Sequence, residues 1–319
     1  MPRPEALSSG SHGFGGVIHL LYHGRLGNNL FQYCFGRVLA EELQCALLAR
    51  PIPGFEHATS LHLESACGVC EREIGLRQER ADSRIQLQEK GGVSHLRFDE
   101  ILPCLRSGKA RKRITIDYGC FLHVPFYRDY VDQIRHRWLR IPDRFRIHEN
   151  ALTIHIRSGD IWQENISKEP HDSYCALPFS FYETIVKQRA WQHIHVVTED
   201  CNDPMVRKLS HCYGASIVSG TAFEDFSFIK SSKNIVLAVS TFSWFAAFLS
   251  QARTIYYPLA GLFHRGIRPD VNLQVNEPRY CYCRVYPDDQ FRDRFKGVFS
   301  SGKPSWKGTQ DVRQFLLVG

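Results

Sequence analysis

The chain has 319 residues, of which 43% are hydrophobic and 23% are charged, and its formal net charge is +7 at pH 7. This composition is ordinary for a globular protein of one or two domains and excludes a largely disordered chain. No apolar stretch reaches the length of a membrane span, so we predict no integral membrane segment in this sequence. The positive charge is compatible with an anionic ligand, although a solvated basic face explains it at least as well.

The first residues and the cysteines set further limits. Residues 1–15 contain no apolar core of the kind that a secretory signal peptide has, and we expect them to form a flexible tail. The chain has eleven cysteines, most of which we expect to be reduced, buried thiols. The one CxxC motif, Cys67–Cys70, lies far from the CxC motif Cys281–Cys283. This spacing does not indicate a zinc site, and we predict no bound metal.

The first half of the chain predicts a strand, a glycine loop and a helix, followed by less regular sequence. Apolar residues recur with helical spacing over 30–45, after the apolar strand 16–23 and the loop 24–29. Residues 46–110 contain few long periodic runs, and we predict irregular structure there. The remaining predicted elements are a strand and loop over 113–124, a helix over 127–139 and a charged, proline-containing linker over 140–150.

From residue 151 onward, short apolar strands alternate with helical patterns, which is typical of a parallel, doubly wound sheet. The predicted strands are 151–157, 193–199, 215–219, 234–240 and 254–258, and the predicted helices are 178–190, 202–212, 223–232 and 243–251. The tail 270–319 is rich in tyrosine and basic residues and ends in an expected helix. We therefore predict an α/β protein with two Rossmann-like domains facing across a cleft, over residues 16–145 and 146–319.

The strand 151–157 ends in the charged sequence HIRSGD, residues 155–160. Ligands of α/β sheets bind at the carboxyl ends of the strands. The planar, always charged guanidinium of Arg157 suits a phosphate or a carboxylate. Asp160 could hold Arg157 in place or cap the next turn. A structural salt bridge at the strand end explains the same residues equally well.

The sequence GRLGNN, residues 24–29, leads into the first predicted helix. A glycine loop before a helix presents free N–H groups and a partial positive charge, and Arg25 adds a full charge. The pattern is neither GxGxxG nor a Walker loop, so it is weak evidence for a dinucleotide. Asn28 as an ordinary helix N-cap is the alternative interpretation.

Three further groups of polar residues lie at predicted strand ends. Ser240 and Thr241 join a strand to a helix, where hydroxyl groups can cap the helix and the helix end can hold a phosphate. Glu199 and Asp200 end another strand and could accept hydrogen bonds from a ribose or a base, or be solvated turn residues. The long polar loop 161–176 could supply a general base, and its candidates are Glu164, Glu169, His171 and Asp172, among which the spacing does not choose.

Four segments, in this order, resemble the fucosyltransferase superfamily, and most closely its α-1,2-fucosyltransferase-like branch, glycosyltransferase family 11. GRLGNNLFQYCFGRVLA is similar to the GRLGNQMFQYA-type opening of that family, and HIRSGD is similar to its HxRRxD-type signature. LPFSFYETIV resembles its LPxxYY segment, and STFSWFAAFLS resembles its SSFSWWGAWL-type segment. The match covers about residues 17–45 and 150–260. Ser158 stands in place of the second signature arginine, and Phe245 in place of a tryptophan.

The resemblance implies a GT-B-type, inverting glycosyltransferase that moves a sugar, fucose above all, from a GDP-sugar to a glycan hydroxyl without a required metal or cofactor. It implies an acceptor-side first domain and a donor-binding second domain. The residues that we expect in catalysis are Arg157, Asp160 and Glu164. The residues that we expect to bind the donor are His155, Arg157, Gly24, Arg25, Gly27, Asn28, Glu199, Asp200, Ser240 and Thr241.

Three alternatives remain. Ser158 motivates the same scaffold with another nucleotide-sugar donor, and together with Phe245 it motivates a non-catalytic glycan- or nucleotide-binding relative. Nucleic-acid binding through the basic segments 107–113 and 132–147 is weak, because no recognised motif accompanies them. We expect a cytoplasmic protein, with peripheral membrane association compatible with that, or a Golgi lumenal one if the natural protein has a membrane anchor.

Overall fold

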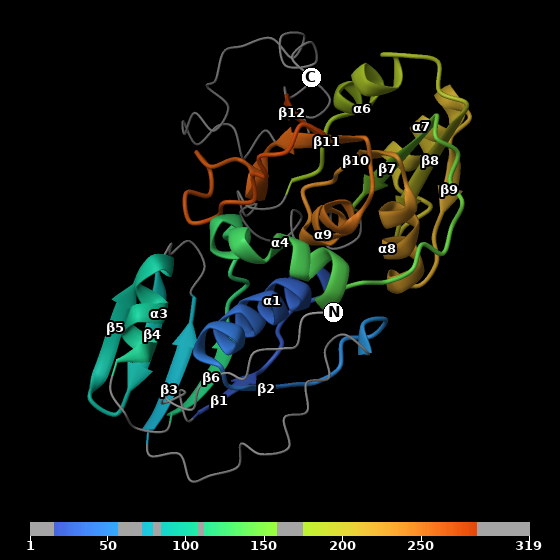
Figure 1. The fold of residues 1–319 in the computed structure, drawn as a ribbon. Coiled ribbons are helices and arrows are strands. Elements are labelled where there is room, and N and C mark those ends of the chain that lie inside the picture. Colours follow the sequence, from blue (N-terminus) through green and yellow to red (C-terminus); the bar gives the residue numbers. More distant parts are fainter. Residues whose placement is uncertain (1–15, 57–71, 79–83, 108–111, 158–174, 286–319) are drawn as a thin grey trace.

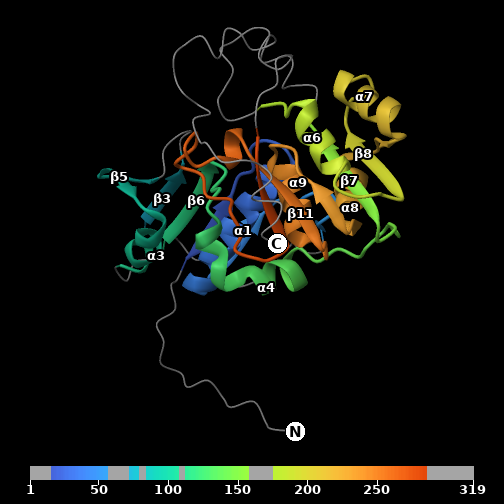
Figure 2. The same cartoon turned by 90° about the horizontal axis from the view of Figure 1, so that it is seen from above.

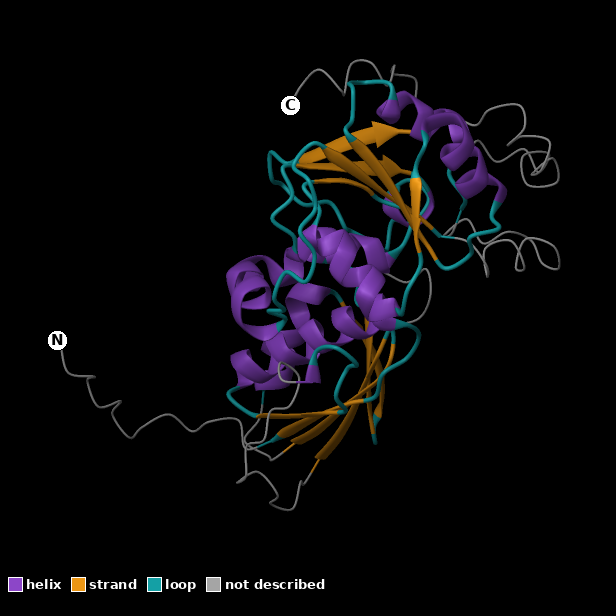
Figure 3. Cartoon of the chain, turned by 90° about the vertical axis from the view of Figure 1, so that its right-hand side faces the viewer, coloured by secondary structure: helices purple, strands orange, loops and turns teal. Residues whose placement is uncertain are grey.

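The computed structural model describes residues 16–56, 72–78, 84–107, 112–157 and 175–285. These residues form two six-stranded sheets with a layer of helices between them (Figures 1 and 3). The strands of the first sheet come from residues 17–118, and those of the second from 151–284. The predicted α/β architecture with two sheets dominated by parallel strands is confirmed.

The first sheet has the strand order β2-β1-β6-β3-β4-β5. Its strands are β1 (Val17–Leu20), β2 (Ala46–Ala49), β3 (Arg72–Arg77), β4 (Ile85–Glu89), β5 (Gly92–Leu96) and β6 (Lys112–Tyr118). The four neighbouring strands β2, β1, β6 and β3 are parallel to one another. The strands β4 and β5 add an antiparallel hairpin at the edge. The prediction of irregular structure over 46–110 is wrong, because this segment supplies four strands and the helix α3 (Phe98–Arg106).

The second sheet has the strand order β12-β11-β10-β7-β8-β9, and all its strands are parallel. Its strands are β7 (Ala151–Ile156), β8 (His193–Thr198), β9 (Ser216–Val218), β10 (Asn234–Val236), β11 (Thr254–Leu259) and β12 (Tyr280–Arg284). Counted within this sheet, the order is 3-2-1-4-5-6, which is that of a Rossmann fold. The strand order reverses between β7 and β10, because successive strands are added on one side of β7 and then on the other. Open α/β sheets bind ligands at such a switch point.

The helices differ from the predictions mainly at their ends. The helix α1 (Leu26–Leu43) begins four residues earlier than expected, within the predicted glycine loop. The predicted helix 127–139 is instead a 3₁₀ turn η1 (Val124–Tyr130), a short α4 (Val131–Gln133) and a π-helical turn η2 (Ile134–Trp138). The remaining helices are α6 (Phe179–Val186), α7 (Pro204–Tyr213), α8 (Ala222–Ser231), α9 (Thr241–Leu249) and a 3₁₀ turn η3 (Gly261–Phe263).

The helices α1 and α9 join the two halves of the molecule through one hydrophobic core. They lie against each other between the sheets (Figure 2). The ring of Phe31 on α1 lies 4.9 Å from that of Trp244 and 4.8 Å from that of Phe245, both on α9. Phe245, which stands in place of a tryptophan in the family pattern, is buried and belongs to this core. This packing fixes the amino ends of α1 and α9 relative to each other.

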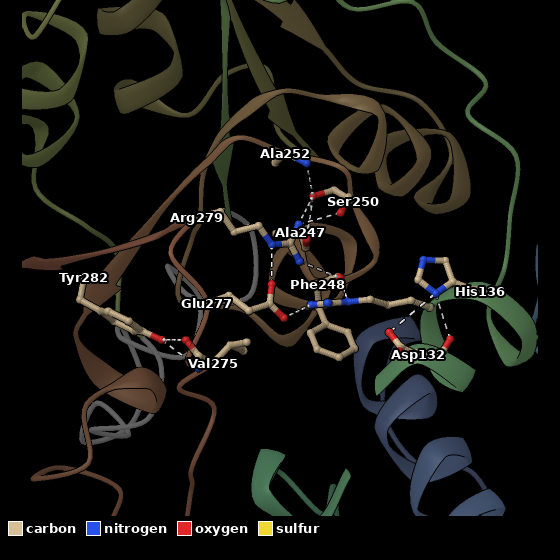
Figure 4. Close-up of polar contacts among 11 residues, drawn as sticks. Asp132, His136, Ala247, Phe248, Ser250, Ala252, Val275, Glu277, Arg279 and Tyr282 are labelled. Atoms are coloured by element: carbon tan, nitrogen blue, oxygen red, sulfur yellow. Dashed lines mark hydrogen bonds and ion pairs between the residues drawn. The ribbon is translucent and has the colours of Figure 1, made fainter. Parts of the chain in front are cut away.

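Two arginines hold the carboxyl end of α9 (Figure 4). Arg135 of η2 donates from Nε to the carbonyl of Phe248 at 2.8 Å, and Arg279 donates to the same carbonyl at 3.2 Å. Both arginines also pair with the carboxylate of Glu277. Cations at a helix carboxyl end satisfy its free carbonyls and oppose its dipole. The segment before the linker thus anchors α9 directly.

No helix in the described part of the chain is long and apolar enough to cross a membrane. The predicted tail 1–15, the predicted closing helix near the carboxyl end and the CxxC motif Cys67–Cys70 lie outside the described residues.

Candidate functional site

The carboxyl ends of four parallel strands, one from the first half of the molecule and three from the second, bring the predicted site residues together. Arg25 follows β1, Arg157 follows β7, Glu199 follows β8 and Ser240 follows β10. Arg25 Nη1 lies 3.0 Å from Glu199 Oε2, which joins the two halves at this edge. Asp160 and Glu164 lie outside the described residues, and so does Ser158. The roles of Asp160 and Glu164 stay predictions.

The amino end of α1 packs on the amino end of α9. A Cβ atom placed on Gly27 would lie 2.5 Å from the backbone nitrogen of Phe242 and 2.6 Å from the carbonyl carbon of Thr241. The hydroxyl of Thr241 donates to Asn28 Oδ1 at 2.9 Å. Gly27 therefore permits a close backbone approach between the two halves, and a direct contact of Gly27 with a donor stays a prediction.

The interpretation of Asn28 as a helix N-cap is wrong. The N-cap position of α1 is Arg25, whose side chain makes no capping hydrogen bond, and Asn28 lies inside the first turn. The side-chain oxygen of Asn28 instead accepts the hydrogen bond from Thr241 across the α1–α9 seam, which is the contact between the amino ends of these two helices. Gly24 has a φ of +81°, and a Cβ there would lie 2.6 Å from Asn28 Nδ2. A glycine at 24 thus lets the loop turn tightly around the Asn28 side chain.

His155 is a buried, neutral group next to the helix α9. Its side chain is 8% exposed, and its ring lies 5.4 Å from that of Phe242. Burial, together with the nearby charge of Arg157, lowers the pKa of His155 to about 3. Among the described residues, no hydrogen-bond partner reaches its Nδ1 atom. A neutral imidazole with an open nitrogen can donate to or accept from a ligand without adding charge.

The low pKa of His155 predicts a stability change with pH. The unfolded histidine has a pKa near 6.5, so between about pH 3 and 6.5 the unfolded chain binds more protons than the folded one. The stability from the neutral ring is therefore fully present above pH 6.5 and is lost as the pH falls toward 3. At pH 5 we expect this residue to lower the free energy of unfolding by about 2 kcal/mol relative to pH 7.5.

Urea unfolding of the wild type and of His155→Gln at both pH values checks this expectation. The variant carries a side chain that does not titrate, so its stability should fall less on acidification, by about 2 kcal/mol. Equal losses in the two proteins would show that His155 titrates normally in the folded state.

The other predicted residues divide into those that face the seam and those that build turns. Ser240 is the N-cap of α9, because its hydroxyl accepts from the backbone N–H of Phe242 at 3.2 Å. The expected capping role is thus observed. Asp200 serves the turn after β8, where its carboxylate accepts from the N–H of Asn202 at 2.8 Å. Glu199, whose side chain is 46% exposed, points to Arg25 instead.

Two glutamines that brace the site from the first half of the molecule were not among the predicted site residues. Gln32 Nε2 donates to the carbonyl of Gly119 at 2.6 Å, and Gln32 Oε1 accepts from the N–H of His23 at 3.0 Å. Gln78 Oε1 accepts from the N–H of Phe121 at 2.9 Å. The only signal available was a polar residue, Gln32, inside the apolar run of α1.

No metal-ligand cluster is found among the described residues: they contain no group of three or more His, Cys, Asp or Glu side chains arranged to hold a metal ion. The nine cysteines within the described ranges form no disulfide with one another.

The comparison with protein-family models agrees with the resemblance. The family model described as glycosyl transferase family 11 matches residues 133–261, a segment that contains HIRSGD and α9. No curated protein sequence matches the chain. Among solved structures, the crystal structure of POFUT1 in complex with GDP is similar with a TM-score of 0.44 and 11% identity, over 75% of this chain and 96% of that chain.

The Rossmann-ordered sheet and the family match together define the class: the protein is a glycosyltransferase. The match over residues 133–261 confirms the predicted resemblance to glycosyl transferase family 11 over this part of the chain.

Proposed function

We propose that the protein is an inverting, metal-independent fucosyltransferase that moves fucose from GDP-fucose to a hydroxyl group of a glycan. The observation that carries this proposal is the convergence of Arg25, Arg157 and the amino end of α9 at the carboxyl ends of β1, β7 and β10. A diphosphate carries the negative charge that such a group of cations and helix N–H groups would neutralise.

The transfer creates negative charge on the leaving diphosphate while the sugar becomes oxocarbenium-like. Arg157, at the end of a fully buried strand, would hold the pyrophosphate with two parallel hydrogen bonds. Arg25, from the opposite half, would reach the same group if the diphosphate displaced Glu199 from the ion pair. Preorganised donors of this kind stabilise the charge that develops in the transition state.

Inversion requires the acceptor hydroxyl to attack the face of the sugar opposite the diphosphate, with its proton passing to a base. Carboxylates are the candidates, and the predicted ones are Asp160 and Glu164. Glu199 becomes a third candidate if the donor releases it from Arg25. Two arginines and a helix terminus supply the positive charge for which other transferases use a metal ion, which supports a reaction without one. A cofactor is likewise not required by this chemistry.

A thermal-shift panel with GDP, UDP, dTDP, CMP and the corresponding nucleotide sugars tests the donor. A nucleotide at about 100 times its Kd should stabilise the protein by about 2.7 kcal/mol. We expect this for GDP and GDP-fucose alone, with and without EDTA, and we expect NMR of the product to show the inverted anomeric configuration.

The same panel separates the alternatives. Stabilisation by another nucleotide would replace the fucosyl assignment by another donor on the same scaffold. Stabilisation by GDP-fucose without transfer to any glycan would identify a non-catalytic binding protein. No shift with any nucleotide would contradict donor binding altogether.

A further inference from the structure

An exposed tyrosine lies at the carboxyl end of a strand in the first sheet, next to the proposed donor site. No role in the proposed reaction has been assigned to this strand. Tyr118 is the last residue of β6, which pairs with β1, and its side chain is 37% exposed. Of the four large hydrophobic side chains that are exposed within the described residues, it is the aromatic one. The others are Leu48, Val93 and Ile217.

Two polar side chains contact the Tyr118 ring, and one of them also pairs with Asp117. The ring of His23 meets it edge-on, with centroids 5.7 Å apart. The guanidinium carbon of Arg77 lies 5.9 Å from the ring centroid, and Arg77 Nε donates to Asp117 Oδ1 at 3.1 Å. The guanidinium of Arg77 therefore links the exposed ring of Tyr118 to the carboxylate of Asp117 at the ends of β3 and β6.

The backbone that carries Tyr118 is rigid. Gly119 has a φ of +115°, and a Cβ there would lie 2.8 Å from the side chain and 3.0 Å from the backbone of Gln78. Gln78 donates from its backbone N–H to the carbonyl of Tyr118 at 3.0 Å, and Gln32 donates to the carbonyl of Gly119. A ring on a fixed backbone loses little conformational freedom when it binds a ligand, which favours a recognition role.

The same surface adjoins the proposed donor site. His23, which contacts Tyr118, is two residues before Arg25, and β1 and β6 are neighbouring strands about 4.8 Å apart. A molecule that lies on the Tyr118 ring would therefore lie beside the Gly24–Arg25 loop, from the side of the first domain.

The geometry points to an acceptor subsite in which one pyranose ring of a carbohydrate stacks on Tyr118 while its hydroxyl groups bind Asp117 and Arg77. This inference rests on the proposed function. A pyranose has an apolar C–H face that suits an aromatic ring, and hydroxyl groups that need both acceptors and donors. Tyr118 supplies the face, Asp117 the acceptor and Arg77 the donors. The arrangement thus selects a sugar acceptor over the serine or threonine hydroxyl of a protein.

The test uses a printed panel of oligosaccharides and unglycosylated peptides with radiolabelled GDP-fucose, followed by kinetics on the glycan that is labelled best. Tyr118→Ala should raise the KM for that glycan about tenfold, which corresponds to about 1.4 kcal/mol. Tyr118→Phe, which keeps the ring, should stay within about twofold of the wild type. GDP binding and the slow hydrolysis of GDP-fucose without acceptor should be unchanged in both variants.

Two further variants keep the test decisive. Tyr118→Leu has apolar volume but no ring, and it should behave as Tyr118→Ala does even if the alanine variant folds poorly. Leu48→Ala removes another exposed apolar side chain of the same sheet and should leave the KM unchanged. An unchanged KM in Tyr118→Ala and Tyr118→Leu, or labelling of peptides only, would overturn the inference while leaving the fucosyltransferase intact. Absence of GDP binding in the wild type would overturn both.

Discussion

Gly27→Ala is expected to lower the free energy of unfolding by about 1–3 kcal/mol and transfer activity by about a hundredfold. The added methyl group would lie 2.5 to 2.7 Å from the backbone nitrogen of Phe242, the carbonyl carbon of Thr241 and the Thr241 hydroxyl. Cβ atoms do not approach other heavy atoms so closely, and two of these three atoms belong to the backbone. The amino ends of α1 and α9 must therefore move apart.

The activity loss follows from what these two helix ends carry. Arg25 precedes α1, Ser240 caps α9, and the hydrogen bond between Asn28 and Thr241 links them. A separation of even about 1 Å would misplace donors on opposite sides of the bound diphosphate, and misplacement on that scale costs about 10²-fold in rate. The measurements are urea unfolding and transfer kinetics of the purified variant.

Gly36→Ala is the matched control, because it makes the same change in the same helix. A Cβ at Gly36 would meet only side-chain methyl carbons, the nearest being Leu47 Cδ1 at 3.2 Å. Alanine also favours the helix interior by about 1 kcal/mol over glycine. This variant should retain stability and activity. If Gly27→Ala behaved like Gly36→Ala, the seam between α1 and α9 would not position the site.

The central strands of the second sheet, β7 and β10, could be predicted from sequence because they are buried on both faces, whereas the edge strand β12 was not predicted. All six residues of β7 are buried, so the strand appears as a continuous apolar run between turn residues. In the first sheet, β1 and β6 were predicted, but the strands β2 to β5 were missed for the opposite reason. In β3 only Ile74 and Leu76 are buried, and every residue of β5 is at least partly exposed. Such short, half-polar strands are stabilised by their neighbours in the sheet, which no local pattern reports.

The site was predictable as a set of strand ends but not as a set of contacts. Arg157, Glu199 and Ser240 were singled out as the ends of predicted strands, and Arg25 as part of a glycine loop before a helix. The structure places all four at one edge of the two sheets. The hydrogen bond between Asn28 and Thr241 joins residues 213 positions apart. Neither residue has a sequence context that specifies the other, and this explains why Asn28 was interpreted as a local cap.

Arg157→Ala is expected to lower kcat by about 10²–10³-fold and to abolish the thermal shift with GDP, while leaving the melting temperature of the free protein nearly unchanged. Arg157 follows the last residue of β7 and is half-buried, so its removal opens no cavity in the core. Activity and GDP affinity would fall because the diphosphate would lose its contact with the guanidinium at the switch point. It would keep its contacts with the amino end of α9 and with Arg25.

Two companion variants separate the geometry of that guanidinium from its charge. Arg253→Ala removes an exposed arginine, paired with Glu149, before β11 at the opposite edge of the same sheet, and it should leave kcat and GDP binding unchanged. Arg157→Lys keeps the charge but loses the planar fork that binds two phosphate oxygens at once. If a bidentate contact to the pyrophosphate is what Arg157 provides, the lysine variant should recover only part of the lost GDP affinity. Full recovery would mean that a single positive charge is sufficient there, and unchanged turnover in Arg157→Ala would remove Arg157 from the donor site.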